Sequence, residues 1–400
     1  MRILVVATSS QGGAGIAATR SFNALRNSGV DVAFLSLDGE NTSGAERANW
    51  LQFQVSVLVR KIITFIQRTI VQSTSQPFTG YSYGFLSRAY RNVYKKYDII
   101  HFHSTYNIAN TKIFREYSER GKSLVFTMHD ERLSTGGCHY SGNCSKIQND
   151  CRSCPIVKPL FQGIPVRSLS ASRDFMSLNT RIEITAPSFW LAQKAELSPA
   201  LKGRSVHVIN NPIPEKFFQL GDSEKESIGS TLKVGFISQD LWNPFKGFEI
   251  LLTAIQSSDE ATKRRIELKV ATATQNVKLP DSLKVDFTHP RTEEELSNFY
   301  RGIDILVVPS VEDNSPSVIG ESLASGTPVI GTDTGGIPEL LNLFAQPIVE
   351  KANVSSLIAA LNRVVTSGLP AVDTDFVMQQ LSEKQYVEKT LSLYQRLNRA

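Results

Sequence analysis

Short apolar runs alternate with amphipathic stretches along almost the entire chain. The run from Ile3 to Ala7 is continuously apolar, as expected for a strand that is buried on both faces. A helical pattern follows from Ala14 to Ser28 and ends before Gly29. The same reasoning predicts further strands at Val32 to Leu37, Ile99 to Phe102, Leu124 to Met128, Ile182 to Ala186 and Val206 to Ile209. Strands that alternate with helices predict a parallel sheet covered on both faces.

A second series of the same kind begins after the polar stretch Gly221 to Ser230, which is the best candidate for a linker. Its strands are predicted at Leu232 to Ile237, Ile266 to Ala271, Val285 to Thr288, Ile305 to Val308 and Val329 to Gly331. The last amphipathic helix, Glu383 to Leu397, has no strand after it. We therefore expect an α/β protein with two doubly wound, Rossmann-like domains facing each other across a cleft. We place them at residues 1–215 and 216–380, with the terminal helix at 381–400.

The composition is that of a folded globular protein. Apolar residues make up 41% of the 400 residues and charged residues 20%, which excludes a disordered chain. The net charge of +5 permits an anionic substrate or a membrane surface, but it does not indicate a nucleic-acid-binding protein. The sequence has no run of eighteen apolar residues and enters its first strand without a secretory signal, so we expect a cytoplasmic protein.

The stretch from Ile305 to Ile330 carries the clearest chemical information. A buried strand is followed by a turn and a short helix, for which Ser315 is the expected N-cap and Pro316 the first helical residue. The free N–H groups of Ser317 and Val318 would then point beyond the end of the strand, where a phosphate can bind. The pattern therefore predicts an anion site at this turn.

Two carboxylates accompany the predicted anion site. Asp313 lies just before the helix, and Glu321 lies inside it. Acids beside an anion site indicate a ligand that carries hydroxyl groups next to its phosphates, and a nucleotide sugar has this chemistry.

This stretch resembles the donor-binding signature of retaining glycosyltransferases of family 4, which have the GT-B fold. Asp313-Asn314-Ser315-Pro316 is similar to an Asp-Asn-x-Pro form found in a subgroup that acts in bacterial surface polysaccharide synthesis. The resemblance implies that Glu321 binds the ribose of the donor nucleotide and that Asp313 approaches the transferred sugar. It also implies that the C-terminal helix crosses back onto the first domain.

Two further motifs resemble donor-site elements of the same family. Lys246-Gly247 matches the lysine that would neutralise the donor diphosphate, although the arginine usually found before it is absent and Ser238 and Gln239 stand in its neighbourhood. Gly335-Gly336 is similar to a glycine element that lines the donor site, while Glu339 just after it suits the first turn of a helix.

The first strand is followed by a glycine-rich loop that includes Gly13 and Gly15. Glycines let the backbone approach a ligand closely, and the resemblance places this loop near the donor phosphates and the acceptor. The spacing Gly13-x-Gly15-x-x-Ala18, with Asp38 after the second strand, also matches a dinucleotide fingerprint. A nicotinamide-dependent enzyme is therefore an alternative interpretation.

Three histidines follow predicted strands. His101 and His103 alternate at the end of one strand, and His129 ends the next. Residues at the carboxyl ends of strands border the ligand crevice in α/β sheets. His129 matches the family's cleft histidine, which approaches the transferred sugar, and we expect His101 to be packed or hydrogen-bonded.

All four cysteines lie within one short segment, the Cys-rich insertion at residues 135–155. A chain of this kind should keep its thiols reduced. Cys151-x-x-Cys154 is a chelating pair that Cys138 and Cys144 could complete, so we hypothesise a structural zinc site. The alternative is four free or redox-paired cysteines.

The segment from Leu51 to Gln72 is amphipathic and basic, and it contains no acid. Such a helix can lie on an anionic membrane or pack on its own domain.

Together these observations predict a retaining glycosyltransferase that moves a sugar from a nucleoside diphosphate sugar to a hydroxyl of a glycan or lipid-linked acceptor in bacterial polysaccharide biosynthesis. Its catalytic residues would be His129, Asp313 and Lys246. The strand ends carry no Asp-x-Asp motif, so we expect no catalytic metal. An inactive protein that kept the donor site is a further alternative.

Overall fold

The computed structural model describes residues 1–36, 58–59, 61–74, 76–79, 94–103, 111–177, 181–219, 231–279 and 284–399. The chain divides into two compact units. The first comprises Met1–Asn211 and Tyr386–Ala400, and the second comprises Pro212–Gln385. The boundary between Asn211 and Pro212 therefore lies shortly before the predicted boundary at residue 215. The boundary between Gln385 and Tyr386 lies inside the predicted terminal helix.

The first unit contains a six-stranded parallel sheet in the order β2-β1-β3-β4-β5-β6. Its strands are β1 (Ile3–Ala7), β2 (Val32–Ser36), β3 (Ile99–Phe102), β4 (Ser123–Thr127), β5 (Ile182–Ala186) and β6 (Val206–Val208). Its described helices include α1 (Gly12–Asn27), α5 (Thr111–Glu119), α6 (Gly163–Ser177), α7 (Phe189–Glu196) and most of α15 (Glu383–Arg399). Residues 61–71 are also helical and end in the π-helical turn η1 (Gln67–Val71).

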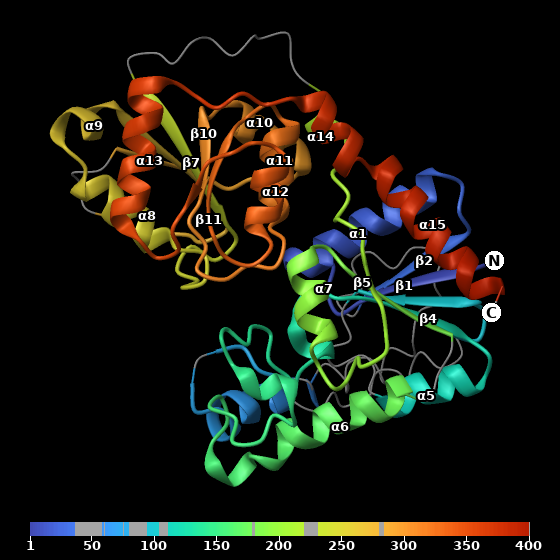
Figure 1. Cartoon of the computed structure of the whole chain (residues 1–400). Helices are drawn as coiled ribbons and strands as arrows, with labels where there is room; N and C mark the ends of the chain where they lie inside the picture. Colours follow the sequence, from blue (N-terminus) through green and yellow to red (C-terminus); the bar gives the residue numbers. More distant parts are fainter. Residues whose placement is uncertain are drawn as a thin grey trace. The chain divides into compact units, whose positions relative to one another are not determined.

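The apolar residues of β1 divide between the two faces of this sheet, because successive side chains of a strand point in opposite directions. Ile3 and Val5 pack with α1 and with Leu393 and Tyr394 of α15. Leu4 packs into the core that includes residues of α5, α6 and α7. The C-terminal helix thus covers the first unit, as predicted (Figure 1).

The second unit contains a parallel sheet in the order β12-β11-β10-β7-β8-β9. Its strands are β7 (Leu232–Ser238), β8 (Ile266–Thr272), β9 (Val285–Thr288), β10 (Ile305–Val308), β11 (Val329–Thr332) and β12 (Ile348–Val349). Its helices are α8 (Phe248–Ser257), α9 (Glu260–Arg265), α10 (Glu293–Arg301), α11 (Ser317–Ala324), α12 (Ile337–Leu343), α13 (Val354–Ser367) and α14 (Thr374–Leu381). Helices α8 and α13 cover one face, and α10 to α12 cover the other (Figure 1).

Both sheets have a topological switch point, where two neighbouring strands lead to helices on opposite sides. In the first unit it lies between β1 and β3, and in the second between β7 and β10. Ligands of open α/β sheets bind outside the carboxyl ends of the strands at such points. The segments that follow these four strands are therefore the candidate ligand-binding segments.

The two doubly wound sheets confirm the predicted fold class, and the predicted strands agree with the observed ones to within about a residue at each end. β12 was not predicted, because two residues are too few to show a period. The expected linker and Asp38 lie outside the described residues. Within the described ranges, no helix combines the length and apolarity needed to cross a bilayer.

Candidate functional site

Lys246 and Asp313 meet at the switch point of the second unit. Lys246 lies in the segment after β7, and Asp313 lies in the segment after β10, which is the neighbouring strand. The ammonium Nζ of Lys246 donates a hydrogen bond to Oδ2 of Asp313 over 2.6 Å. The Asp313 side chain is largely buried, while about a third of the Lys246 side chain is exposed. The fold therefore juxtaposes two of the three predicted catalytic residues.

The glycine element after β11 holds the backbone of Asp313. The N–H of Gly336 donates to the carbonyl oxygen of Asp313 over 3.2 Å. Gly335 has a φ of 60°, and a Cβ at this position would lie 1.6 Å from the same oxygen. No residue with a side chain fits there, so these glycines pack the loops of the site together. Glu339 lies in the first turn of α12, where its charge complements the helix dipole.

The helix α11 begins beside these residues, but not as the sequence predicts. Pro316 is the N-cap residue and Ser317 the first helical residue, so the expected cap at Ser315 is wrong. The physical reason is the extended backbone of Pro316, with a ψ of 114°, which places the helix start one residue later. No N-cap side chain accepts from the first turn, which leaves the N–H groups of Ser317 and Val318 suited to an anion.

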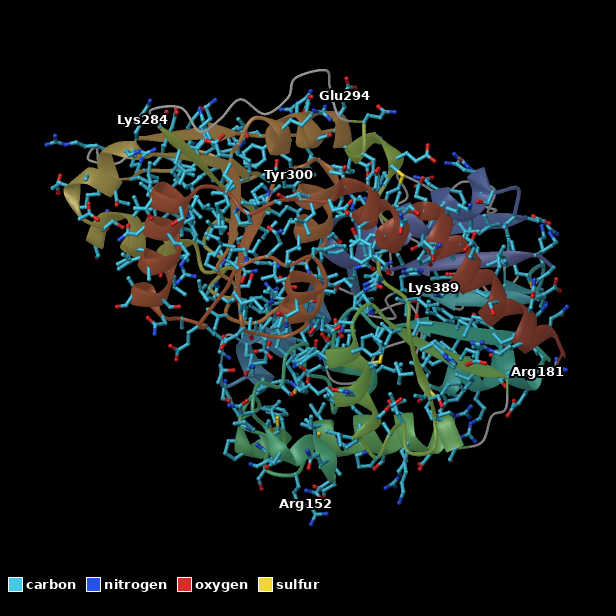
Figure 2. All side chains as sticks on the ribbon, turned by 45° about the horizontal axis from the view of Figure 1, so that its top comes forward. Arg152, Arg181, Lys284, Glu294, Tyr300 and Lys389 are labelled. Carbon is cyan, nitrogen blue, oxygen red and sulfur yellow. The ribbon has the colours of Figure 1, made fainter. Side chains whose placement is uncertain are left out.

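Glu321 lies one turn further along α11, buried in the second unit. Its Oε2 accepts a hydrogen bond from the hydroxyl of Tyr300 over 2.7 Å. Tyr300 is fully buried in α10, in the interior of the second unit, where Figure 2 labels it. Tyr300 was not predicted as a site residue, since an aromatic residue in an amphipathic helix indicates only a core position. A buried tyrosine needs a partner for its hydroxyl, and only the fold shows that the partner is Glu321.

Ser238 and Gln239, which stand where the family usually has an arginine, form hydrogen bonds with nearby backbone groups. Ser238 Oγ donates to the carbonyl oxygen of Asp240 over 2.6 Å. The carbonyl oxygen of Gln239 accepts from the N–H of Ala273 over 3.2 Å. These contacts fix the segment that leads to Lys246.

His129 belongs to a histidine cluster in the first unit. Its Nε2 lies 3.0 Å from Nδ1 of His103, which follows the neighbouring strand β3. Loss of hydration on burial lowers the pKa of His129 to about 4, with Asp130 and Arg132 acting in opposite directions. Burial also lowers the pKa of His103 well below its ordinary value. His129 is therefore a neutral imidazole near pH 7.

His101 is a structural residue, as predicted. Its two ring nitrogens lie 2.6 Å from the hydroxyl of Tyr394 and 2.7 Å from Oγ1 of Thr127. Burial lowers the pKa of His101 to about 3, and the neighbouring His129 acts in the same direction. The cluster thereby ties the end of β3 to the C-terminal helix.

The acidic residues after His129 fix their own loop. Burial alone would raise the pKa of Asp130, but the Arg132 guanidinium, 2.6 Å away, brings the pKa below its ordinary value. Glu131 is fully buried and pairs with the Lys194 ammonium over 2.9 Å. The pair of Glu131 and Lys194 was not predicted, because the two residues are distant along the chain.

The glycine-rich segment after β1 lies mainly inside a helix. Helix α1 begins at Gly12, two residues before the predicted start, so Gly13 and Gly15 belong to its first turn. A Cβ on Gly15 would lie 2.3 Å from the carbonyl oxygen of Ser9, whereas Gly13 has open space around it. Gly15 is thus needed by the fold, and Gly13 is the residue that leaves room for a ligand.

Three of the four cysteines are buried, Cys138 and Cys154 in one small core and Cys151 in the main core of the first unit. Cys138, Cys151 and Cys154 are each less than a tenth exposed, and Cys144 is half-buried. A hydrogen bond between Cys138 and Cys154 lowers the pKa of Cys154 to about 6, while burial works against this shift. As placed, the described residues contain no group of three or more histidines, cysteines or acids able to hold a metal ion. The zinc site stays a prediction that metal analysis can decide.

Residues 231–367 match the family Glycosyl transferases group 1. Among curated proteins, the D-inositol 3-phosphate glycosyltransferase of Corynebacterium diphtheriae is 35% identical over 108 residues. That alignment covers 24% of this chain and 25% of the relative. The MMP alpha-(1->4)-mannosyltransferase of Mycolicibacterium hassiacum is 24% identical over 208 residues, which cover 48% of this chain and 49% of the relative. The alignments thus span about a quarter to a half of these relatives.

Solved structures match over nearly the whole chain. Anabaena HepE in complex with UDP has a TM-score of 0.62 at 14% identity and covers 99% of this chain and 100% of its own. Sucrose-phosphate synthase of Thermosynechococcus elongatus has a TM-score of 0.61 at 14% identity, with 99% of both chains covered. At such low identity the likeness shows the fold alone. The chain has the GT-B fold, and residues 231–367 of its second unit match the family Glycosyl transferases group 1.

Proposed function

We propose that the protein is a retaining glycosyltransferase that moves a sugar from a nucleoside diphosphate sugar to a hydroxyl of a glycan or lipid-linked acceptor. The proposal includes a role in bacterial polysaccharide biosynthesis, to which the Asp-Asn-x-Pro segment points. The group 1 match over residues 231–367 and the known binding of UDP by HepE, a protein of similar fold, support a nucleotide-sugar donor.

The observation that carries the proposal is the contact between Lys246 and Asp313 at the switch point, beside the start of α11. One cation and a set of helical N–H groups can together hold a diphosphate. A carboxylate at the same point can accept hydrogen bonds from sugar hydroxyls. The site therefore has the charges that a nucleotide sugar requires at its two polar parts.

In this proposal Lys246 and the N–H groups of Ser317 and Val318 stabilise the charge that develops on the leaving diphosphate. Preorganised charge of this kind usually contributes more to catalysis than any other single effect. Glu321, oriented by Tyr300, accepts hydrogen bonds from the ribose hydroxyls. Asp313 contacts the transferred sugar, and the resemblance assigns His129 to the same sugar. The chemistry we propose uses no catalytic metal.

A transfer assay with one nucleoside diphosphate sugar at a time tests this function. Proton NMR of the first product formed should show the anomeric configuration of the donor, because we propose a retaining enzyme. Asp313→Ala should abolish both transfer and donor hydrolysis, whereas Asp304→Ala, an acid at the opposite end of β10, should leave them unchanged.

Two outcomes would overturn the proposal. A product of inverted configuration would contradict retention. Donor binding without transfer or hydrolysis by the wild-type chain would indicate an inactive binding protein.

A further inference from the structure

The helical residues between Leu58 and Val71 carry their apolar side chains on the outside. Phe65 is 66% exposed, and its apolar neighbours on the same face are between 41% and 60% exposed. We call this set, Leu58, Ile62, Phe65, Ile66 and Ile70, the apolar stripe. Its members recur every three or four residues or lie side by side, so they share one face of the helix.

The opposite face of this segment fixes it to the first unit. Gln67 and Val71 are buried, and Val71 packs with Val157 and Cys154. The N–H of Lys158 donates to the carbonyl oxygen of Val71 over 2.9 Å. The face that packs on the first unit therefore contains one polar and one apolar residue, while the apolar stripe lies on the exposed face.

Another exposed apolar residue follows the point where Lys158 contacts this segment. Leu160 is 86% exposed in the short turn that follows Lys158. The Lys158 ammonium donates to the carbonyl oxygen of Thr69 over 3.0 Å, so this cation lies against the last turn of the segment.

The charged residues of the segment that carries the stripe have one sign. Lys61 and Arg68 are exposed, and no described carboxylate forms an ion pair with either side chain. From Arg47 to Tyr97 the sequence contains eight lysine and arginine residues and no aspartate or glutamate. The chain as a whole carries only +5, so its remainder is net acidic and its positive charge is concentrated here.

We propose that the apolar stripe docks the protein on an anionic lipid bilayer. The apolar side chains would enter the boundary between headgroups and acyl chains, while Lys61, Arg68 and Lys158 would contact lipid phosphates. A second copy of the chain fits less well, because a two-fold interface would bring the same cations face to face. The inference does not rest on the proposed function, because it uses none of the donor-site residues.

Flotation of the full chain with vesicles tests the docking. The protein should float with vesicles that contain phosphatidylglycerol and much less with phosphatidylcholine alone. High salt should weaken binding, because screening removes the electrostatic part. A protein that stays at the bottom with anionic vesicles would overturn the proposal.

Matched variants locate the contact. Ile62→Ser with Phe65→Ser should reduce vesicle affinity by about tenfold or more, because two apolar side chains no longer leave water. Lys61→Gln with Arg68→Gln should cost about fivefold per charge. The controls are Leu197→Ser and the pair Lys112→Gln with Arg115→Gln, which alter exposed residues in other elements of the first unit. Equal losses in controls and stripe variants would contradict a local contact.

A reporter distinguishes insertion from self-association. Relative to the wild-type chain, which contains three tryptophans, Phe65→Trp should add fluorescence that brominated lipid quenches, whereas the fluorescence added by Leu197→Trp should not be quenched. If light scattering shows a dimer that Ile62→Ser with Phe65→Ser dissociates, and brominated lipid does not quench Trp fluorescence, the stripe is a subunit interface and the proposal is wrong.

Discussion

The two units use the same type of sheet but present different chemistry at their switch points. In the second unit a charged pair, Lys246 and Asp313, lies beside an uncapped helix start and is braced by Gly335. In the first unit, neutral imidazoles lie at the ends of β3 and of the next strand, β4, with His101 and His103 buried. Charged groups suit a charged donor, and neutral donors and acceptors of hydrogen bonds suit hydroxyl groups.

The sequence comparisons divide along the same line. The family match lies entirely within residues 231–367, in the second unit, while the likeness to solved structures extends over nearly the whole chain. The first unit is thus similar to known proteins in its fold, while the matched family model does not extend into its sequence. The difference teaches that motifs carry our proposal for the second unit, whereas proposals for the first unit rest on physical features such as the histidine cluster and the apolar stripe.

The largest expected effect is on catalysis at the charged pair. Lys246→Ala should lower kcat about 10²- to 10³-fold, because it removes one preorganised charge from the leaving group. Lys246→Arg should recover part of the rate. The exposed Lys284→Ala is the control. Steady-state kinetics measures the effect. A change confined to KM would show that Lys246 binds the substrate and the transition state equally, which would contradict a role in stabilising the leaving group.

The next effect concerns the donor ribose. Glu321→Gln should raise the donor Kd by about tenfold or more, because a charged hydrogen-bond acceptor is lost. Tyr300→Phe should weaken donor binding by only about fivefold, since it removes one neutral hydrogen bond that orients Glu321. Calorimetric titration checks the ranking. A larger loss for Tyr300→Phe than for Glu321→Gln would show that the tyrosine contacts the donor itself.

The histidine cluster should make the first unit acid-sensitive. The folded-state pKa of His101 is about 3, below the ordinary value of 6.5, so the unfolded state binds a proton first as the pH falls. Stability should therefore fall from about pH 6.5 downward, by about 2 kcal/mol at about pH 5 from one such imidazole. Urea unfolding near neutral pH and at about pH 5 measures the loss of stability, and His101→Gln should reduce this loss. An unchanged free energy of unfolding between the two pH values would contradict a neutral, buried cluster.

A last stability effect separates two glycines of the same helical turn. Gly15→Ala should destabilise the fold by about 1–3 kcal/mol, because its Cβ would overlap the Ser9 carbonyl. Gly13→Ala has room for its Cβ and should leave the thermal midpoint unchanged, yet weaken donor binding if the backbone approaches the diphosphate there. Equal stabilities for the two variants would contradict the close contact at Gly15.

The strands and most helix limits were predictable from sequence, because each depends on local apolar periodicity and on glycine or proline positions. The cap of α11 was missed because a serine and a proline in succession both satisfy the rules for a helix start. The Tyr300–Glu321 and Lys194–Glu131 contacts were missed because partners from different elements leave no local signal. The exposed apolar stripe was only half predicted, since amphipathicity does not tell which face points outward.

The most direct test of the central claim is a thermal-shift panel of UDP, GDP and ADP, their sugars and nicotinamide dinucleotides, measured on the wild-type chain and on Glu321→Ala and Lys246→Ala. A ligand that binds only the folded state raises the melting temperature by mass action. The account predicts that one nucleoside diphosphate and its sugar raise the Tm and that both variants lose the shift. A shift with a nicotinamide dinucleotide alone, retained in both variants, would move the ligand to the glycine turn of α1 and contradict the account.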